Sequence, residues 1–197
     1  FAEFMALHEI LNKNSLEWTE ADVAAAKQNK RYDLLYGFHH YAQYHAYTQF
    51  KRDFIDRVHS SGGKIWYDQP MFTNKDSVAV WKHPEEYLDP KNTDKYPGIV
   101  MPEWGVNERW TELALRNWTE LKHKNYAPVL NAHDHWLKEG CDGGRLDALH
   151  FAYNDNPGQL KSGDEPGAEF VKALADVFKT NQKIPFAEAF EGKNFLK

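Results

Sequence analysis

The sequence has only one cysteine, and its composition lacks the features of several large protein classes. With Cys141 alone, internal disulfide bonds and a cysteine-rich zinc site are excluded. No apolar run approaches the roughly 18 residues that a membrane-spanning helix needs. Positive charge is not in excess, because 24 Lys and Arg stand against 29 Asp and Glu, for a net charge of -5. We therefore expect no nucleic-acid or membrane partner, and the absence of a basic-then-apolar leader favours a cytoplasmic location.

What remains is the composition of one globular domain. The chain has 197 residues, 42% of them hydrophobic and 15% aromatic, enough for a real core. It begins in a helical pattern at Phe1 and stops at Lys197 without a polar tail, so we expect a part of a longer sequence. We predict one partial domain over 1–197, with a helical N-terminal segment at 1–31 within it.

Periodicity along the chain predicts helices that alternate with short strands. Thr19 has the position of an N-cap, and Gly62 and Gly63 close a long helical stretch. Residues 73–102 are polar and rich in Pro, Asp, Asn and Lys, which indicates a long loop. The predicted helices cover 32–59, 110–121, 129–137 and 170–178, and the predicted strands cover 64–68, 141–149 and 184–188.

This alternation favours parallel strands joined by helical crossovers, and hence the α/β class. A doubly wound sheet lacks its usual Gly-rich phosphate fingerprint between a strand and a helix. Acidic residues lie instead at the C-terminal ends of the strands, where (β/α)8 barrels keep their catalytic groups. The sequence therefore predicts part of a (β/α)8 TIM barrel.

Three carboxylates, Asp68, Asp147 and Glu188, lie at these strand ends. A pair of carboxylates, one protonated and one ionised, is what the cleavage of a glycosidic bond requires. Arg145 lies two residues before Asp147, on the same side of the strand, where it is expected to keep that carboxylate ionised. The apolar run before Glu188 is expected to raise the pKa of its carboxyl, as suits a general acid.

Four motifs in register resemble one enzyme family. Asp142-Gly143-Gly144-Arg145-Leu146-Asp147-Ala148 resembles the nucleophile strand of the α-amylase clan of retaining glycosidases. The remaining three are similar to the amylomaltases, the disproportionating enzymes or 4-α-glucanotransferases. They are Tyr67 to Phe72 with the loop through Asp76, Ser77 and Trp81; Glu103 to Asn107; and Pro185 to Glu188.

The resemblance implies roles for these residues. Asp147 would be the nucleophile that forms a covalent glycosyl-enzyme, Glu188 the acid/base, and Arg145 the residue that holds the nucleophile. The reaction would transfer α-1,4-glucan segments, with an α-1,4-glucan or maltooligosaccharide as partner and with no metal or organic cofactor. The implied substrate-binding residues are Asp68, Asp76, Ser77, Trp81, Trp104, Asn107 and His150.

The sequence also departs from the family pattern. Ala148 replaces a His that follows the nucleophile in the family, with His150 the nearest His, and Ala79 and Ala189 replace two acidic residues. The clan's third catalytic carboxylate would lie on a strand after Lys197. Two further hypotheses therefore stand beside the enzyme: a non-catalytic structural or interaction component that binds protein partners, and glucan binding without turnover.

Overall fold

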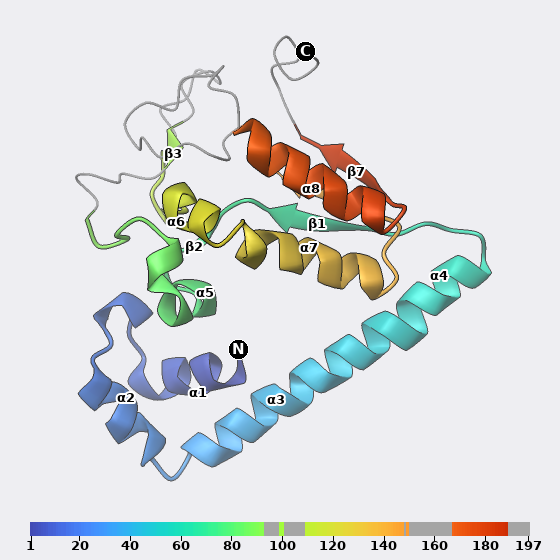
Figure 1. Cartoon of the computed structure of the whole chain (residues 1–197). Helices are drawn as coiled ribbons and strands as arrows, with labels where there is room; N and C mark the ends of the chain where they lie inside the picture. The colour runs from blue at the N-terminus through green and yellow to red at the C-terminus, as the bar shows by residue number, and fades with distance from the viewer. Residues whose placement is uncertain (93–98, 101–108, 148, 150–166, 189–197) are drawn as a thin grey trace.

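The centre of the molecule is a parallel three-stranded sheet with helices packed against it (Figure 1). The computed structural model describes residues 1–92, 99–100, 109–147, 149 and 167–188. The strands are β1 (Trp66–Pro70), β6 (Gly143–Asp147) and β7 (Ile184–Ala187), in the order β1-β6-β7. Both pairings are parallel. The predicted α/β class is confirmed, whereas a closed barrel remains a prediction.

Helices α7 (Ala127–Lys138) and α8 (Ala168–Thr180) pack together and against the sheet (Figure 1). Both were expected from the spacing of their apolar residues. The main core lies between these helices and the strands, and Trp118, Leu121, Phe170 and Phe178 are among its most deeply buried side chains. Cys141 is fully buried just before β6, in agreement with a structural role for this thiol.

The N-terminal third of the chain is helical. Thr19 caps its helix as predicted, because its side chain accepts from the Asp22 amide while the Asp22 carboxylate accepts from the Thr19 amide. The long predicted helix forms one rod in Figure 1, with a π-helical segment within it. It ends at Ser60, and Gly62 follows with φ +79°. The elements are α1 (Ala2–Leu11), η1 (Ser15–Glu17), α2 (Glu20–Lys27), α3 (Tyr32–Thr48), η2 (Gln49–Ile55) and α4 (Asp56–Ser60).

The predicted helix over 110–121 is wrong over its first two thirds. The helix α6 begins only at Trp118, and two short strands, β4 (Arg109–Trp110) and β5 (Leu113–Ala114), precede it. Leu113 and Ala114 pair with β2 (Thr73–Asn74), and Asn117 caps α6 by accepting from the Glu120 amide. Pairing with a strand that is distant in the sequence thus outweighs the helical periodicity of this segment.

The segment 73–102 contains short regular elements where a loop was expected. Its described part includes, besides β2, the helix α5 (Val78–Lys82), the 3-10 turn η3 (Pro84–Glu86) and β3 (Ile99–Val100), which pairs with β4. These elements are too short to produce a periodic pattern in the sequence. The central strands also differ at their ends from the prediction: β1 continues to Pro70, while β6 is shorter than 141–149.

Candidate functional site

The three strand-end carboxylates meet at one guanidinium group, as their positions in the sequence predicted. Nη1 of Arg145 lies 2.6 Å from Oδ2 of Asp68. Nη2 of the same residue lies 2.9 Å from Oδ1 of Asp147 and 2.5 Å from Oε2 of Glu188. We call these four residues the Arg145 cluster. One side chain on the middle strand thus links groups from all three strands.

The strand register explains why the cluster forms. Asp68 is the register partner of Arg145, and Asp147 is that of Pro70. Glu188 follows β7, and its amide still donates to the carbonyl of Leu146 at 3.1 Å. Because side chains alternate along a strand, Asp68, Arg145 and Asp147 all project from one face, opposite to the buried Tyr67 and Leu146.

The surroundings of Glu188 differ from the expected apolar setting. Ile184 and Phe186 are 68% and 63% exposed, so these two side chains contribute little to the burial of Glu188, whose own side chain is 23% exposed. In the described part of the chain, β7 lies at the edge of the sheet, where few side chains cover it. The apolar sequence of β7 alone does not predict the surroundings of Glu188, because hydrophobic residues bury a neighbouring side chain only where other elements pack on them.

At Asp147, Arg145 acts on the pKa in the expected direction, but other effects outweigh it. Burial raises the pKa of Asp147 above its ordinary value, and the hydrogen bond that it shares with Glu188 raises it further. The charge of Arg145 acts in the opposite direction without reversing the shift. Two carboxylates that share one site cannot both ionise easily, so a proton is retained more readily here than at an isolated carboxylate.

Asp76 contacts the N-terminal segment, whereas Ser77 makes local contacts. Asp76 accepts from the Ser15 amide at 3.0 Å, and its other carboxylate oxygen lies 3.0 Å from Nε2 of His8. Ser77 caps α5 by accepting from the Val80 amide. The contacts of Asp76 hold the N-terminal helices against the segment after β2.

Trp81 lies in an aromatic group near the N-terminus. Its ring centroid is 5.6 Å from that of Trp18 and 5.9 Å from that of Phe4, and the Lys82 ammonium lies 4.1 Å above it. Trp18 and Trp81 also line a 400 Å³ hollow with residues of α2. Three of the other predicted substrate-binding residues lie outside the described residues: Trp104, Asn107 and His150.

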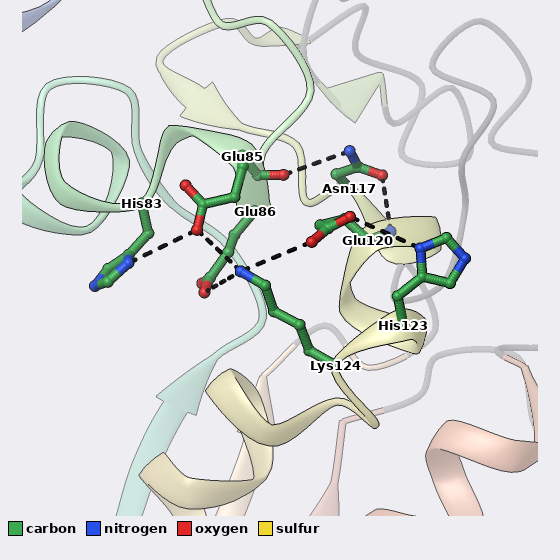
Figure 2. Close-up of polar contacts among 7 residues, drawn as sticks. All are labelled: His83, Glu85, Glu86, Asn117, Glu120, His123 and Lys124. Carbon is green, nitrogen blue, oxygen red and sulfur yellow. Dashed lines mark hydrogen bonds and ion pairs between the residues drawn. The ribbon is translucent and has the colours of Figure 1, made fainter.

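A second polar cluster, which the sequence did not suggest, surrounds Lys124 (Figure 2). Its Nζ lies 2.9 Å from Oε1 of Glu85 and 3.4 Å from Oε1 of Glu86, and Glu120 is 3.9 Å away. His83, Glu85 and Glu86 are the one group of potential metal ligands found among the described residues. The ammonium group already supplies the positive charge between the two glutamates, so the cluster fits an ionic tie between η3 and α6 (Trp118–His123) better than a metal site.

Comparisons with known proteins agree with the family resemblance. The family model for 4-alpha-glucanotransferases, glycoside hydrolase family 77, matches residues 1–152. The fold is similar to that of amylomaltase from Streptococcus agalactiae, solved in complex with acarbose, with a TM-score of 0.73 and 22% sequence identity. That match covers 100% of this chain and 42% of the amylomaltase chain. Among curated proteins there is no match.

The chain therefore spans less than half of the solved amylomaltase that it resembles. None of the helices in the described ranges is both long and apolar enough to cross a lipid bilayer. The family model matches more than half of the chain, including β1, β6 and three of the four residues of the Arg145 cluster. The chain belongs to the 4-alpha-glucanotransferase family.

Proposed function

We propose that the chain provides the nucleophile and the acid/base of a retaining transfer between α-1,4-glucans. The observation that carries this proposal is the contact of Asp147 and Glu188 with the same nitrogen of Arg145. The two contact distances limit the separation of the contacting oxygens to about 5.4 Å. This upper limit is below the about 6.5–9.5 Å that inverting enzymes need to admit a water molecule, and it favours the retaining mechanism, in which the carboxyl groups are about 5–5.5 Å apart. In the free protein the two carboxyls are closer still, because they share a hydrogen bond.

In the proposed reaction, a carboxylate oxygen of Asp147 attacks the anomeric carbon of the donor. The bond from that carbon to the glycosidic oxygen breaks, and the protonated Glu188 gives its proton to the departing oxygen. A hydroxyl group of the acceptor glucan then attacks the same carbon and loses its proton to Glu188, and Asp147 is released. Arg145 orients Asp147 and stabilises its ionised form while Asp68 holds the other side of the guanidinium group.

The pKa values suit this sequence of steps once a glucan binds. In the free protein, the raised pKa of Asp147 reflects burial and its hydrogen bond with Glu188. A sugar ring placed between the two groups breaks that hydrogen bond and leaves Asp147 paired with Arg145 alone. Asp147 then loses the hydrogen bond that raises its pKa, which favours the ionised form that a nucleophile needs.

We further propose that β1, β6 and β7 are consecutive strands of a (β/α)8 barrel. Three parallel neighbours in chain order, joined through helices, support this reading. In such a barrel the exposed side chains of Trp66 and Phe186 would face the interior beneath the Arg145 cluster.

The test is an Asp147→Asn variant of the full-length protein, assayed for glucose release from maltotriose. The variant removes the nucleophile at nearly constant volume, so transfer should fall by at least about a thousandfold with an unchanged circular dichroism spectrum. Asp176→Asn, on the exposed face of α8, is the matched control and should keep full activity. Persisting activity in Asp147→Asn would remove Asp147 from this role.

A second candidate is a non-catalytic interaction component, and the exposure of α3 favours it. Leu34, Phe38 and Tyr41 are 74%, 61% and 63% exposed and follow one another at helical spacing. Under this alternative the full-length protein shows no turnover, and Asp147→Asn changes nothing. Measurable affinity for maltooligosaccharides without transfer would instead identify glucan binding alone.

A further inference from the structure

A buried hydrogen bond lies directly behind the Arg145 cluster. The hydroxyl of Tyr67, on β1, and Nδ1 of His133, on α7, are 2.8 Å apart. Both residues are buried, and His133 has no exposed surface. Burial lowers the pKa of His133 to about 4 and raises that of Tyr67, so at neutral pH both groups are neutral. The hydroxyl then donates and the ring nitrogen accepts.

The burial of His133 for this hydrogen bond lowers the stability of the fold. Within the described part of the chain, Nε2 of His133 is buried without a hydrogen-bond partner. A buried polar atom left without a partner destabilises the fold, so most such atoms in proteins are paired. An apolar residue at 133 would avoid that cost. The presence of a histidine at this position therefore indicates that the contact with Tyr67 does more than fill space.

The ring of Tyr67 also fixes the position of β6. Tyr67 and Gly144 are register partners, and the ring lies against the glycine. A Cβ atom at Gly144 would lie 2.7 Å from the Tyr67 hydroxyl oxygen and closer still to the ring carbon that bears it. Because Gly144 has no side chain, the ring of Tyr67 fits between the backbone of β6 and helix α7.

The next residue on each strand belongs to the candidate site. Asp68 follows Tyr67, Arg145 follows Gly144, and these two residues form the 2.6 Å ion pair. Adjacent residues in a strand point to opposite faces. Tyr67 thus packs on Gly144 on one face of the sheet, and Asp68 pairs with Arg145 at the next position on the opposite face. A shift of the Tyr67 ring displaces β6 and therefore moves the guanidinium group of Arg145.

We propose that Tyr67 and His133 form a positioning pair that sets the placement of β6 and so holds Arg145 against Asp68, Asp147 and Glu188. Tyr67 lies behind the site and acts only through Arg145. This inference rests on the proposed function for its catalytic consequence, and its structural consequence can be measured without turnover. If the pair loosens, Arg145 moves away from Asp147, which then loses the charge that favours its ionised form.

The test is Tyr67→Phe in the full-length protein, which removes the hydroxyl and keeps the ring. Carbon-13 NMR of the side-chain carboxyls should show the apparent pKa of Asp147 raised by about half a unit or more, because Arg145 is less well placed. In the transfer assay, kcat should fall about tenfold with little change in KM, because a small misplacement of a positioning group mainly raises the barrier. His133→Leu, which removes the acceptor, should reproduce both effects.

Leu121→Ala is the matched control, because Leu121 is fully buried in the same core but lies on α6. It should lower the melting temperature and leave the pKa of Asp147 unchanged. An unchanged pKa in Tyr67→Phe, or an equal shift in Leu121→Ala, would overturn the proposal. If the unsubstituted protein transfers no glucan, the proposed function fails, while the NMR titration still decides whether the pair positions Arg145.

Discussion

Arg145 shows how much of the site depends on one side chain. Its planar guanidinium group contacts Asp68 with one terminal nitrogen, and Asp147 and Glu188 with the other. Burial opposes its charge, but the three carboxylates raise the pKa of Arg145 further above its ordinary value. A lysine carries a single nitrogen and could not reproduce this arrangement. Glu188 and the charge of Arg145 therefore both affect the ionisation of Asp147.

His133 makes the stability of the protein dependent on pH. Burial and the charge of Arg116 lower its pKa to about 4 in the folded state, against about 6.5 for an unfolded histidine. Above pH 6.5 neither state is protonated, and between pH 6.5 and 4 only the unfolded state takes up the proton. The free energy of unfolding should therefore fall by on the order of 3 kcal/mol across this interval.

Urea unfolding of the unsubstituted protein and of His133→Phe, at pH 7 and at pH 4.5, measures this contribution. The variant lacks the titrating ring, so its stability should change less between the two pH values. Equal changes in the two proteins would show that His133 does not remain neutral in the folded state.

At the scale of the element, β1 and β6 are joined by more than their backbone hydrogen bonds. The ring of Tyr67 packs on Gly144 on the helix-covered face, and the indole of Trp66 packs on Gly143 on the other face. Glycine normally weakens a strand, but here it allows the rings of the neighbouring strand to approach closely. The two strands thus form one packed unit beneath the Arg145 cluster.

Gly144→Ala tests this packing. The added methyl group collides with the Tyr67 ring, and overpacking of this kind costs about 1–3 kcal/mol. In Tyr67→Ala/Gly144→Ala the collision is gone, so the double variant should be more stable than the sum of the two single effects predicts. Chemical denaturation of all four proteins gives the coupling energy, and strict additivity would contradict direct contact.

At the scale of the whole molecule, the described surface is unevenly covered. Helices α7 and α8 bury one face of the sheet, while α3 has no buried residue along its 17 positions. Between Asp33 and Lys51 the sequence has no Asp, Glu, Lys or Arg. A long, uncharged and aromatic helix surface of this kind favours association with apolar surfaces.

Replacement of two of these exposed side chains should reduce the association of the protein without changing its stability. In Leu34→Glu/Phe38→Lys the new charges lie four residues apart on α3 and can pair with each other. We expect the free energy of unfolding to change by less than about 0.5 kcal/mol, because the original side chains face solvent. Light scattering and binding of a hydrophobic dye should both decrease, and a large loss of stability would mean that these residues pack in the folded protein.

The central sheet could be predicted from sequence because its signals are local. Each strand of the sheet is a short segment of the sequence next to a helix with a clear apolar periodicity. The convergence of Asp68, Asp147 and Glu188 then follows from the parallel order of the strands. The helix predicted over 110–121 failed where Leu113 and Ala114 pair with residues far away in the chain. The pattern of neighbouring residues does not predict pairing between strands that are distant in the sequence.

Parts of the site were not predictable for a similar reason. The pKa of Asp147 depends on burial and on its contact with Glu188, and both are set by tertiary packing. The hydrogen bond between Tyr67 and His133 joins residues 66 positions apart. In the sequence, His133 is one of ten histidines and lies within an ordinary amphipathic pattern, so only its burial distinguishes it.

The two adjacent glycines of β6 also restrict how this sequence can evolve. A side chain cannot be gained at 144 until Tyr67, the aromatic residue opposite it, has become smaller, whereas at 143 the backbone carbonyl of Ile184 also leaves no room for one. The reverse order passes through a protein that folds poorly and would be removed by selection. Among close descendants of this chain, positions 67 and 144 should therefore covary, with the change on β1 appearing first in each lineage, while position 143 should stay glycine.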